Sequence, residues 1–506
     1  MMTRRSFVTT AAAAALGTRL ARSEALEPPF PFTCPEWFRD AKFGIWAHWS
    51  AQCVPEQGDW YARNMYIQGL PQYEHHLRTY GHPSRFGFKQ IDHLWRAERW
   101  DPDALVGRYR RAGAKYFVAL ANHHDNFDNF DSTHHAWNSV RIGPRRDLIA
   151  GWAAAARRHG LPFGVSSHAS HAWHWFQVAY AYDPEGPMAG VRYDGPSAPE
   201  LYTGPRMVAP DGIRTIAAMQ QWHAQHDGRW YEDLPAGDPF VAQWQARTRE
   251  LISRYVPDFL YFDDTGIPFG ARGREVIAHL YRTSIAHYGS NRAIATGKRL
   301  NDEERRLVLE DFERGFSERI EPLPWQTDTC IGDWHYKRDI RYKTVGDVVR
   351  MLLDIVSKNG NLLLNIPVRG DGTIDSREDE FVAGLTAWMD VHGEGIFGTR
   401  PWRVFGEGPP HPAGGMFAEG RAHYGAQDIR FTSKGGTLYA HVLGHPTEPV
   451  RIAALGRDRC ARIRAVSLLG GAEAPAWRQT PAALEITPPR SFPAADTAAF
   501  RITFSG

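Results

Sequence analysis

Residues 257–264 read Pro-Asp-Phe-Leu-Tyr-Phe-Asp-Asp, a short run of aromatic and aliphatic residues that ends in two carboxylates. An apolar run of this length, bounded by proline and by acidic residues, is typical of a strand that is buried on both faces. Because side chains alternate along a strand, Asp263 shares a face with Tyr261 and Phe259. Asp264 faces the other way and can cap a following turn. The spacing alone is equally consistent with both aspartates being helix caps.

Similar apolar runs recur along the chain and alternate with amphipathic stretches. The candidate strands are residues 43–49, 115–121, 162–167, 258–263, 292–296, 307–312, 326–331 and 361–366. Helical patterns lie between several of them, at residues 102–112, 147–159, 240–255, 273–287 and 345–358. This alternation predicts a parallel sheet with crossover helices. Eight strands close a (β/α)8 TIM-like barrel, so we expect the α/β class with that architecture.

The barrel is expected to occupy residues 26–397, followed by a second domain. Residues 171–239 are rich in Gly, Pro and Tyr and indicate an insertion, which barrels often carry on the rim of the site. After Gly398 the pattern changes to short alternating strands, for example at residues 436–443 and 500–504. This pattern predicts a C-terminal antiparallel β-sandwich over residues 398–506.

Composition excludes several classes of protein. The 506 residues are 43% hydrophobic and 23% charged, as in globular proteins rather than disordered or membrane ones. The formal net charge is +2, and the first 25 residues contribute a net +3 of it, which leaves −1 for the rest of the chain. A near-neutral body argues against nucleic acid as the main partner. The 4 cysteines form no CxxC pair, so neither a disulfide scaffold nor a zinc ribbon is expected. The 18 tryptophans favour a carbohydrate enzyme, because indole rings stack on sugars.

The N-terminus has the layout of an export signal. Residues 3–8 read Thr-Arg-Arg-Ser-Phe-Val and precede an apolar run at 9–16, with small residues near 21–25. This is the pattern of a cleaved secretory signal, and the paired arginines suit the twin-arginine route. We expect residues 1–25 to be removed and the protein to be periplasmic or secreted, without membrane insertion. A basic N-terminus that stays in the cytosol is the alternative.

Polar residues finish most of the candidate strands. In a closed barrel the reacting groups project from the C-terminal ends of the strands. The polar residues at or just after these ends are His48, His123, His124, Asp125, His168, Asp263, Asp264, Asp311 and Glu313. A core would use apolar residues there, so their convergence indicates a functional site.

The sequence His123-His124-Asp125 has more than one interpretation. Imidazole and carboxylate are ligands for zinc or iron, which would make the protein a metal hydrolase. Adjacent residues on a strand point to opposite faces, however, so the two histidines share an ion only if the backbone turns. Neutral imidazoles also exchange hydrogen bonds with sugar hydroxyls, and purely structural histidines are a third possibility. We expect no metal and no other cofactor.

Two carboxylates would suffice for glycoside hydrolysis. Asp263 beside aromatic rings suits a nucleophile at an anomeric carbon. The acidic stretch at residues 310–313, two candidate strands further on, supplies Glu313 as a partner. In retaining glycosidases the two groups stand about 5–5.5 Å apart, which side chains on alternate strands can span. A solvated acidic loop is the alternative interpretation of this stretch.

Several ordered motifs resemble the α-L-fucosidases of glycoside hydrolase family twenty-nine, over residues from about 35 to 402. The matching pieces are Lys42-Phe-Gly-Ile-Trp-Ala-His-Trp-Ser50, Asp59-Trp-Tyr61, Ala112-Gly-Ala-Lys-Tyr-Phe117 through His123-His-Asp125, Pro257-Asp-Phe-Leu-Tyr-Phe-Asp263 and Ser357-Lys-Asn-Gly-Asn-Leu-Leu-Leu-Asn365, with Asp371-Gly372 behind it. The resemblance implies a barrel, a C-terminal sandwich and metal-free hydrolysis with retention of configuration.

The resemblance also implies roles for individual residues. It places the nucleophile on Asp263 and the acid/base on Glu313, with Glu310 and Glu318 as fallback positions. The expected sugar-binding residues are His48, Asp59, Trp60, His123, His124, His168 and Trp325. The implied activity is that of an exo-acting retaining α-L-fucosidase on a fucosylated oligosaccharide or glycoconjugate.

Three positions depart from the family pattern and keep alternatives open. Asp59 replaces a glutamate that many members have, and His168 stands where relatives often have tyrosine. An arginine expected after the fifth strand is matched only by Lys298 or Arg299. A related glycosidase acting on another 6-deoxy or galacto-configured sugar is therefore the first alternative, and a noncatalytic sugar-binding relative is the second.

Overall fold

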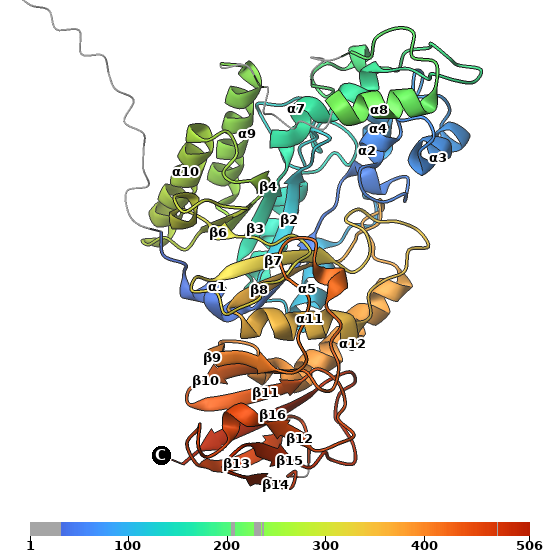
Figure 1. Ribbon diagram of the computed structural model, residues 1–506. Coiled ribbons are helices and arrows are strands. Elements are labelled where there is room, and N and C mark those ends of the chain that lie inside the picture. The colour runs from blue at the N-terminus through green and yellow to red at the C-terminus, as the bar shows by residue number, and fades with distance from the viewer. Residues whose placement is uncertain (1–31, 204–207, 227–233, 235–236, 473, 506) are drawn as a thin grey trace, which may run out of the picture.

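A parallel barrel forms the larger part of the protein (Figure 1). The computed structural model describes residues 32–203, 208–226, 234, 237–472 and 474–505, so the expected export segment at 1–25 lies outside the described residues. The 8 strands pair in the order β6-β5-β4-β3-β2-β1-β8-β7. Their bounds are β1 (Phe43–Ala47), β2 (Phe117–Asn122), β3 (Phe163–Ser167), β4 (Phe259–Thr265), β5 (Ile294–Lys298), β6 (Leu309–Glu310), β7 (Trp325–Cys330) and β8 (Gly360–Asn365). The predicted α/β barrel is confirmed.

The barrel closes through its shortest strand. The pattern at residues 307–312 predicts a full strand, but only Leu309 and Glu310 pair with β5. From there the chain crosses to β7: the Asp311 N–H bonds β5, whereas the Phe312 N–H donates to the Gln326 carbonyl at 2.9 Å. A parallel bridge between Asp311 and Gln326 thus joins the two edges of the sheet. Because this strand ends early, the residues after it form a loop on the C-terminal rim.

Helices on the outside follow the predicted positions closely. They are α5 (Pro102–Arg111), α6 (Leu148–Arg158), α9 (Pro239–Tyr255), α10 (Ala271–Tyr288) and α11 (Val345–Ser357), together with α12 (Ser376–His392), which the sequence pattern did not predict. Side chains of Asp101, Asp147 and Thr344 accept hydrogen bonds from first-turn N–H groups and cap α5, α6 and α11. Apolar side chains fill the barrel interior, where Trp46, Tyr261 and Leu363 belong to one buried cluster.

Further helices cover the C-terminal rim of the barrel, at the top of Figure 1. The segment between β1 and β2 supplies α2 (Tyr61–Asn64), α3 (Pro71–Thr79) and α4 (Phe88–Leu94), whereas α1 (Glu36–Ala41) lies at the opposite end, before β1. The region 171–239, which the composition predicts to be an inserted loop, contains α7 (Ala172–Trp175) and α8 (Ile216–His226). Buried tyrosines hold it, since Tyr73 and Tyr193 both donate to the Asp183 carboxylate. None of the helices in the described residues is long and apolar enough for a bilayer span.

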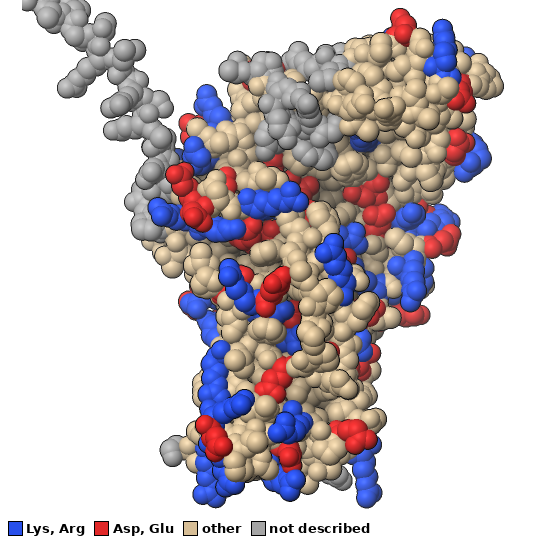
Figure 2. Space-filling view, in the orientation of Figure 1, with Lys and Arg blue, Asp and Glu red and all other residues tan. Residues whose placement is uncertain are grey.

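The C-terminal part is an antiparallel sandwich, below the barrel in Figure 1. A five-stranded sheet in the order β13-β16-β11-β10-β9 faces a three-stranded sheet in the order β12-β15-β14. The strands are β9 (Arg400–Glu407), β10 (Ile429–Lys434), β11 (Thr437–Val442), β12 (Val450–Ile452), β13 (Ile463–Leu468), β14 (Trp477–Gln479), β15 (Leu484–Ile486) and β16 (Ala498–Phe504). The face of the molecule in Figure 2 intersperses acidic and basic side chains, in keeping with the small net charge.

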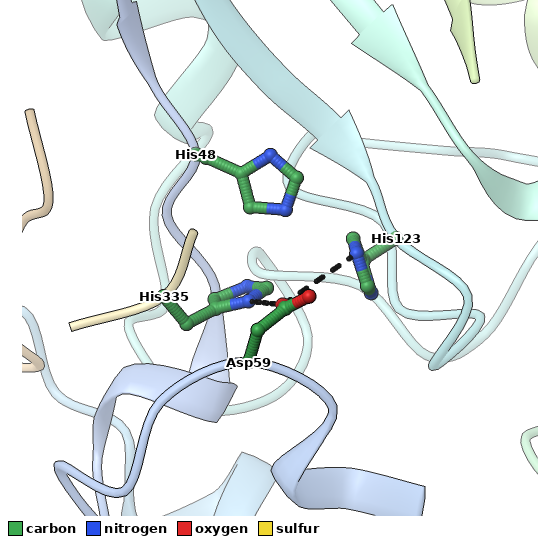
Figure 3. A group of neighbouring side chains, drawn as sticks. All are labelled: His48, Asp59, His123 and His335. Carbon is green, nitrogen blue, oxygen red and sulfur yellow. Dashed lines mark hydrogen bonds and ion pairs between the residues drawn. The ribbon is translucent and has the colours of Figure 1, made fainter. Parts of the chain in front are cut away.

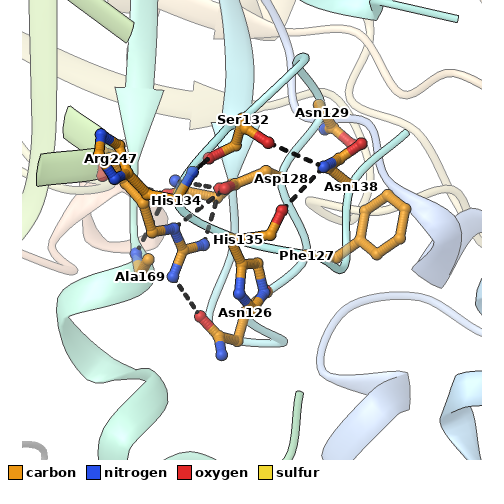
Figure 4. Close-up of polar contacts among 12 residues, drawn as sticks. Asn126, Phe127, Asp128, Asn129, Ser132, His134, His135, Asn138, Ala169 and Arg247 are labelled. Carbon is orange, nitrogen blue, oxygen red and sulfur yellow. Dashed lines mark hydrogen bonds and ion pairs between the residues drawn. The ribbon is translucent and has the colours of Figure 1, made fainter. Parts of the chain in front are cut away.

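A buried ion pair ties the rim loops to the outer helices (Figure 4). Arg247 of α9 donates to both carboxylate oxygens of Asp128, at 3.0 and 2.7 Å. Asp128 lies in the loop after β2 and also accepts from the Asn122 amide at 3.0 Å. The side-chain oxygen Oδ1 of Asn122 in turn accepts from the Ser167 hydroxyl and the His168 N–H, at 3.1 and 3.2 Å. One network therefore sets the ends of β2 and β3, where the candidate histidines stand.

Replacing Arg247 with methionine should therefore both destabilise the protein and disorder the rim. Removal of one partner from a buried, bidentate pair leaves an uncompensated carboxylate, so we expect a loss of about 3–5 kcal/mol in unfolding free energy. The matched control is Arg254→Met on the same helix, whose exposed pairs with Asp131 and Glu250 should contribute about 0–1 kcal/mol. Urea unfolding followed by tryptophan fluorescence measures both. Equal losses in the two variants would contradict the assignment.

Candidate active site

The C-terminal ends of the strands open into a cavity of about 730 Å³. Eight of the predicted site residues line it: His48, Asp59, Trp60, His123, His124, His168, Asp263 and Glu313. They come from the ends of β1, β2, β3 and β4, from the loop after β6 and from the segment before α2. Because the strands are parallel and closed, residues far apart in sequence meet at this one end.

Asp263 and Glu313 meet at a shared cation. Lys298, the last residue of β5, donates to Asp263 Oδ1 and, at 2.5 Å, to Glu313 Oε2. Two hydrogen bonds to one nitrogen bring the two oxygens within about 6 Å of each other. This separation suits a retaining glycosidase, whose carboxyl groups stand about 5–5.5 Å apart. Of the two basic residues that the sequence offered after β5, Lys298 rather than Arg299 occupies this position.

Asp263 is held in its charged form. Burial raises the pKa of a carboxyl group, but the Lys298 ammonium and His168 outweigh it and hold the pKa of Asp263 well below its usual range. His168 Nδ1–H donates to Asp263 Oδ2 at 3.0 Å, and His124 Nε2 lies 3.4 Å from the same oxygen. Burial lowers the pKa of His168 to about 4, so this ring is a neutral donor. The carboxylate is thus ionised and oriented.

Asp264 faces away from Asp263, as the alternation predicts, but it is not a helix cap. Its carboxylate accepts from the Ser170 hydroxyl, at 3.0 and 2.8 Å, and lies 3.1 Å from His171 Nε2. The next helix, α10, is preceded instead by Gly270 without a side-chain cap. Asp264 therefore attaches β4 to the segment after β3 and supports the wall of the cavity.

Four side chains converge on one side of the cavity, as Figure 3 shows: His48, Asp59, His123 and His335. Asp59 Oδ1 lies 2.5 Å from His335 Nδ1 and 4.0 Å from His123 Nε2. His335 is held in turn by the Ser50 hydroxyl, at 2.8 Å from Nε2. His48 is only 2% exposed, and neither of its nitrogens has a partner among the described residues. Burial holds the pKa values of His48 and His123 well below their usual range, so both rings are neutral.

The backbone turn that would bring His123 and His124 together does occur. Strand β2 ends at Asn122, so strict alternation stops there, and the ring centroids lie 4.3 Å apart. Asp125, in contrast, turns away and belongs to none of the described groups that could hold an ion. Its oxygens accept from the Gln52 amide and the Phe127 N–H, at 3.0 and 3.2 Å. The triad expected for a metal hydrolase is therefore not assembled.

Gln52 also sets the tautomer of His123. Its amide nitrogen lies 3.0 Å from Asp125 Oδ2, an acceptor, and 3.0 Å from His123 Nδ1. Because the Gln52 amide nitrogen can only donate, His123 Nδ1 must accept its hydrogen bond. The proton of the neutral His123 ring is therefore on Nε2, which faces Asp59 and the cavity. An N–H in this place offers a hydrogen bond to a hydroxyl group rather than a lone pair to a metal ion.

Trp325 is a correction to the expected set. Trp325 is the first residue of β7 and lies at the N-terminal end of the barrel. The cavity is at the opposite end of the strand, so the Trp325 side chain does not line it. The indole is buried, packs edge-on against Phe312 and donates to the Lys358 carbonyl at 2.8 Å. Its place in the cavity is taken by Trp334, which with His335 follows the C-terminal end of the same strand. Asking which residues finish the seventh strand would have found both.

The class of protein follows from this geometry. Cleavage of a glycosidic bond by two carboxyl groups needs them at this spacing, one of them ionised, beside donors that can hold sugar hydroxyls. A barrel that presents such a pair in a cavity of about 730 Å³ defines a glycoside hydrolase.

The family follows from comparison with known proteins. A family model described as Alpha-L-fucosidase matches residues 30–394, and the chain belongs to that family. The tissue alpha-L-fucosidase of Homo sapiens is 25% identical over 429 residues, which cover 82% of this chain and 77% of that protein. The Rattus norvegicus protein of the same name is 25% identical over 493 residues, covering 93% and 90%. The crystal structure of Thermotoga maritima alpha-fucosidase in complex with fucose has a TM-score of 0.68 and 26% identity, covering 93% of this chain and 97% of that chain.

Replacing Lys298 with methionine should shift the pH dependence of turnover. The ammonium is the main group that lowers the pKa of Asp263, so its removal leaves burial opposed only by the neighbouring histidines and raises that pKa. The sequence predicts that Asp263 is the nucleophile, which must be ionised to react, so the acidic limb of the kcat/KM profile should move to higher pH by about one to three units. Lys298→Arg keeps the charge and should leave the limb near its original position. The profiles are measured on an aryl glycoside, and an unmoved limb in Lys298→Met would contradict this role.

Proposed function

We propose that this protein is an exo-acting, retaining α-L-fucosidase that removes terminal fucose from a fucosylated oligosaccharide or glycoconjugate. The observation that carries the proposal is the contact of Asp263 and Glu313 with the one ammonium of Lys298. Membership of the α-L-fucosidase family and the likeness to a structure titled as a complex with fucose support the choice of sugar.

Hydrolysis by this geometry takes two displacements. Ionised Asp263 attacks the anomeric carbon while Glu313 gives a proton to the departing oxygen, which leaves a glycosyl ester on Asp263. Glu313, now a carboxylate, takes a proton from water, and the water oxygen attacks the same carbon and releases the sugar with its original configuration. Lys298 and His168 favour the second bond cleavage as well, because they stabilise Asp263 as a leaving carboxylate.

The wall of the cavity that contains His48, Asp59 and His123 can form hydrogen bonds with sugar hydroxyl groups. Both ring nitrogens of neutral His48 lack a hydrogen-bond partner within the described part of the chain, and His123 presents an N–H. Asp59 accepts hydrogen bonds and is held in place by His335. We propose that these groups and His124 bind the hydroxyls of the ring, with Trp60 beside its apolar face.

One residue of the sugar-binding wall favours a second candidate function. The family resemblance implies a glutamate where this chain has Asp59, which is one methylene shorter and lies 2.5 Å from His335 Nδ1, so it can hold a hydroxyl group differently. A relative of the fucosidases that acts on another 6-deoxy or galacto-configured sugar is therefore the alternative. A noncatalytic sugar-binding protein is disfavoured, because binding alone does not require two acidic side chains on one ammonium in the cavity.

Turnover of two substrates should separate these activities. We expect an aryl α-L-fucoside to be cleaved at least about 100-fold faster, in kcat/KM, than an aryl β-D-galactoside, because a wrongly configured hydroxyl leaves buried polar groups unpaired. Asp263→Ala should abolish cleavage of the preferred substrate. The reverse preference would move the assignment to the alternative sugar, and undiminished turnover by Asp263→Ala would refute the nucleophile.

The acid/base assignment has its own test, in which azide replaces the missing carboxylate. Azide needs no deprotonation, so it should restore turnover of an activated aryl fucoside to Glu313→Ala and yield a fucosyl azide. Glu310→Ala and Glu318→Ala are matched controls from the same segment. Glu310 accepts from the Leu300 N–H and Glu318 from the Gly414 N–H, and neither lines the cavity. Rescue of either control, with none in Glu313→Ala, would move the role.

We also propose that the protein is exported to the periplasm or secreted. The support is the sequence alone: paired arginines at residues 4–5, an apolar run at 9–16 and small residues near 21–25.

A further inference from the structure

A segment of the C-terminal part reaches up to the cavity. Residues 413–419, between β9 and β10, leave the sandwich and pair with the loop after β6. Gly415 and Phe316 exchange backbone hydrogen bonds, at 2.8 and 3.3 Å, and the Phe417 N–H donates to the Glu313 carbonyl at 2.8 Å. The Glu419 carboxylate accepts from Arg314 Nε at 2.8 Å. The segment is therefore built onto the loop that carries the proposed acid/base.

Phe417 lies on the edge of the cavity and is unusually exposed. Its side chain lines the cavity and is 55% exposed, more than any other large hydrophobic residue in the described part of the chain. It belongs to none of the buried clusters. Its backbone is left-handed, with φ of 55°, a conformation that costs a bulky residue free energy. An exposed aromatic ring on a strained backbone at the edge of a cavity is a candidate contact for a bound molecule.

The same strain recurs around the cavity. Trp60, Arg299 and Arg314 also have left-handed backbones, with φ of 60°, 51° and 46°, and all three line the cavity. Non-glycine residues in this conformation concentrate at ligand sites, because only the surrounding structure makes them persist. Arg299 is exposed, and its Nε lies 3.4 Å from the Met416 sulfur, so the guanidinium retains further N–H groups for a ligand.

The positions of Phe417, Met416 and Arg299 relative to Glu313 indicate which part of the substrate they would bind. In the proposed reaction Glu313 gives its proton to the departing oxygen, so the leaving group lies on the Glu313 side of the fucose ring. Phe417, Met416 and Arg299 stand on that side, because the Phe417 N–H bonds the Glu313 carbonyl. An exposed aromatic face next to a guanidinium suits a pyranose, whose C–H face stacks on the ring while its hydroxyls accept from arginine.

We propose that Phe417, with Met416 and Arg299, forms the binding site for the leaving-group sugar, a pyranose to which the fucose is attached. This inference rests on the proposed function and adds the class of the second substrate sugar. It also gives the C-terminal part a direct role in substrate selection. The sandwich supplies residues 413–419, so the site is complete only when both parts of the chain are present.

Two fucosides with different leaving groups test the proposal. α-L-Fucosyl fluoride loses a single atom, which cannot reach Phe417, whereas a fucosyl disaccharide loses a pyranose. Phe417→Ala should lower kcat/KM for the disaccharide by about 10-fold to 100-fold and change that for the fluoride less than about twofold. Phe417→Trp should keep disaccharide turnover. Leu323→Ala, which removes an equally exposed side chain outside the cavity, should affect neither substrate.

The two substrates distinguish failure of the Phe417 site from failure of the proposed fucosidase activity. Equal loss on both substrates would overturn the site, since Phe417 would then act only by positioning Glu313. No loss on the disaccharide would overturn it as well. Failure of the unaltered protein to cleave fucosyl fluoride would instead refute the proposed fucosidase activity. Thermal unfolding midpoints of the variants, expected within about 2 °C of the unaltered protein for an exposed side chain, show that each one is folded.

Discussion

A single buried ammonium group makes the carboxylate-rich end of this barrel possible. Lys298 lies between Asp263 and Glu313, and these two carboxylates raise the pKa of its amine well above the usual range, although burial acts to lower it. Burial raises the pKa values of Asp311 and Asp328, which lie behind the same group, so they favour the neutral form. The interior therefore carries less negative charge than its four acidic residues imply. Without this compensation, desolvated carboxylates at this spacing would repel one another and open the end of the barrel.

The two parts of the chain are joined at both ends of their interface. Below the barrel, Arg430 of β10 and Lys358 after α11 both contact the buried Asp354 carboxylate, at 2.6 and 2.7 Å. At the rim, residues 413–419 pair with the loop that follows β6. These two attachments fix the position of residues 413–419 at the edge of the cavity. The early end of β6 leaves room for that contact, because the described chain between β6 and β7 forms a loop where other crossovers form helices.

Prediction from sequence succeeded where a residue's neighbours along the chain settle its environment. Hydrophobic periodicity located all eight strands, and the polar residue at each strand end pointed to His48, His123 and Asp263. It failed where the answer depended on segments distant in sequence. Trp325 is a tryptophan near the acidic loop in sequence, but it begins β7 instead of ending it, so it is buried at the other end of the barrel. Trp334 lines the cavity and His335 contacts Asp59 behind its wall, because β7 pairs with β8 and ends at the same rim.

Local patterns in the chain were enough to predict the barrel and the sandwich, because hydrophobic periodicity depends on neighbouring residues. Strand-end chemistry suggested Asp263, whereas the family resemblance placed the acid/base on Glu313, and both catalytic roles stay predictions. Only the tertiary structure decided that Lys298 bridges those carboxylates, that His335 supports Asp59 and that Phe417 stands at the edge of the cavity. These three contacts join residues separated by whole elements. Their distances are set by barrel closure and by the docking of the sandwich, which no pattern of neighbouring residues encodes.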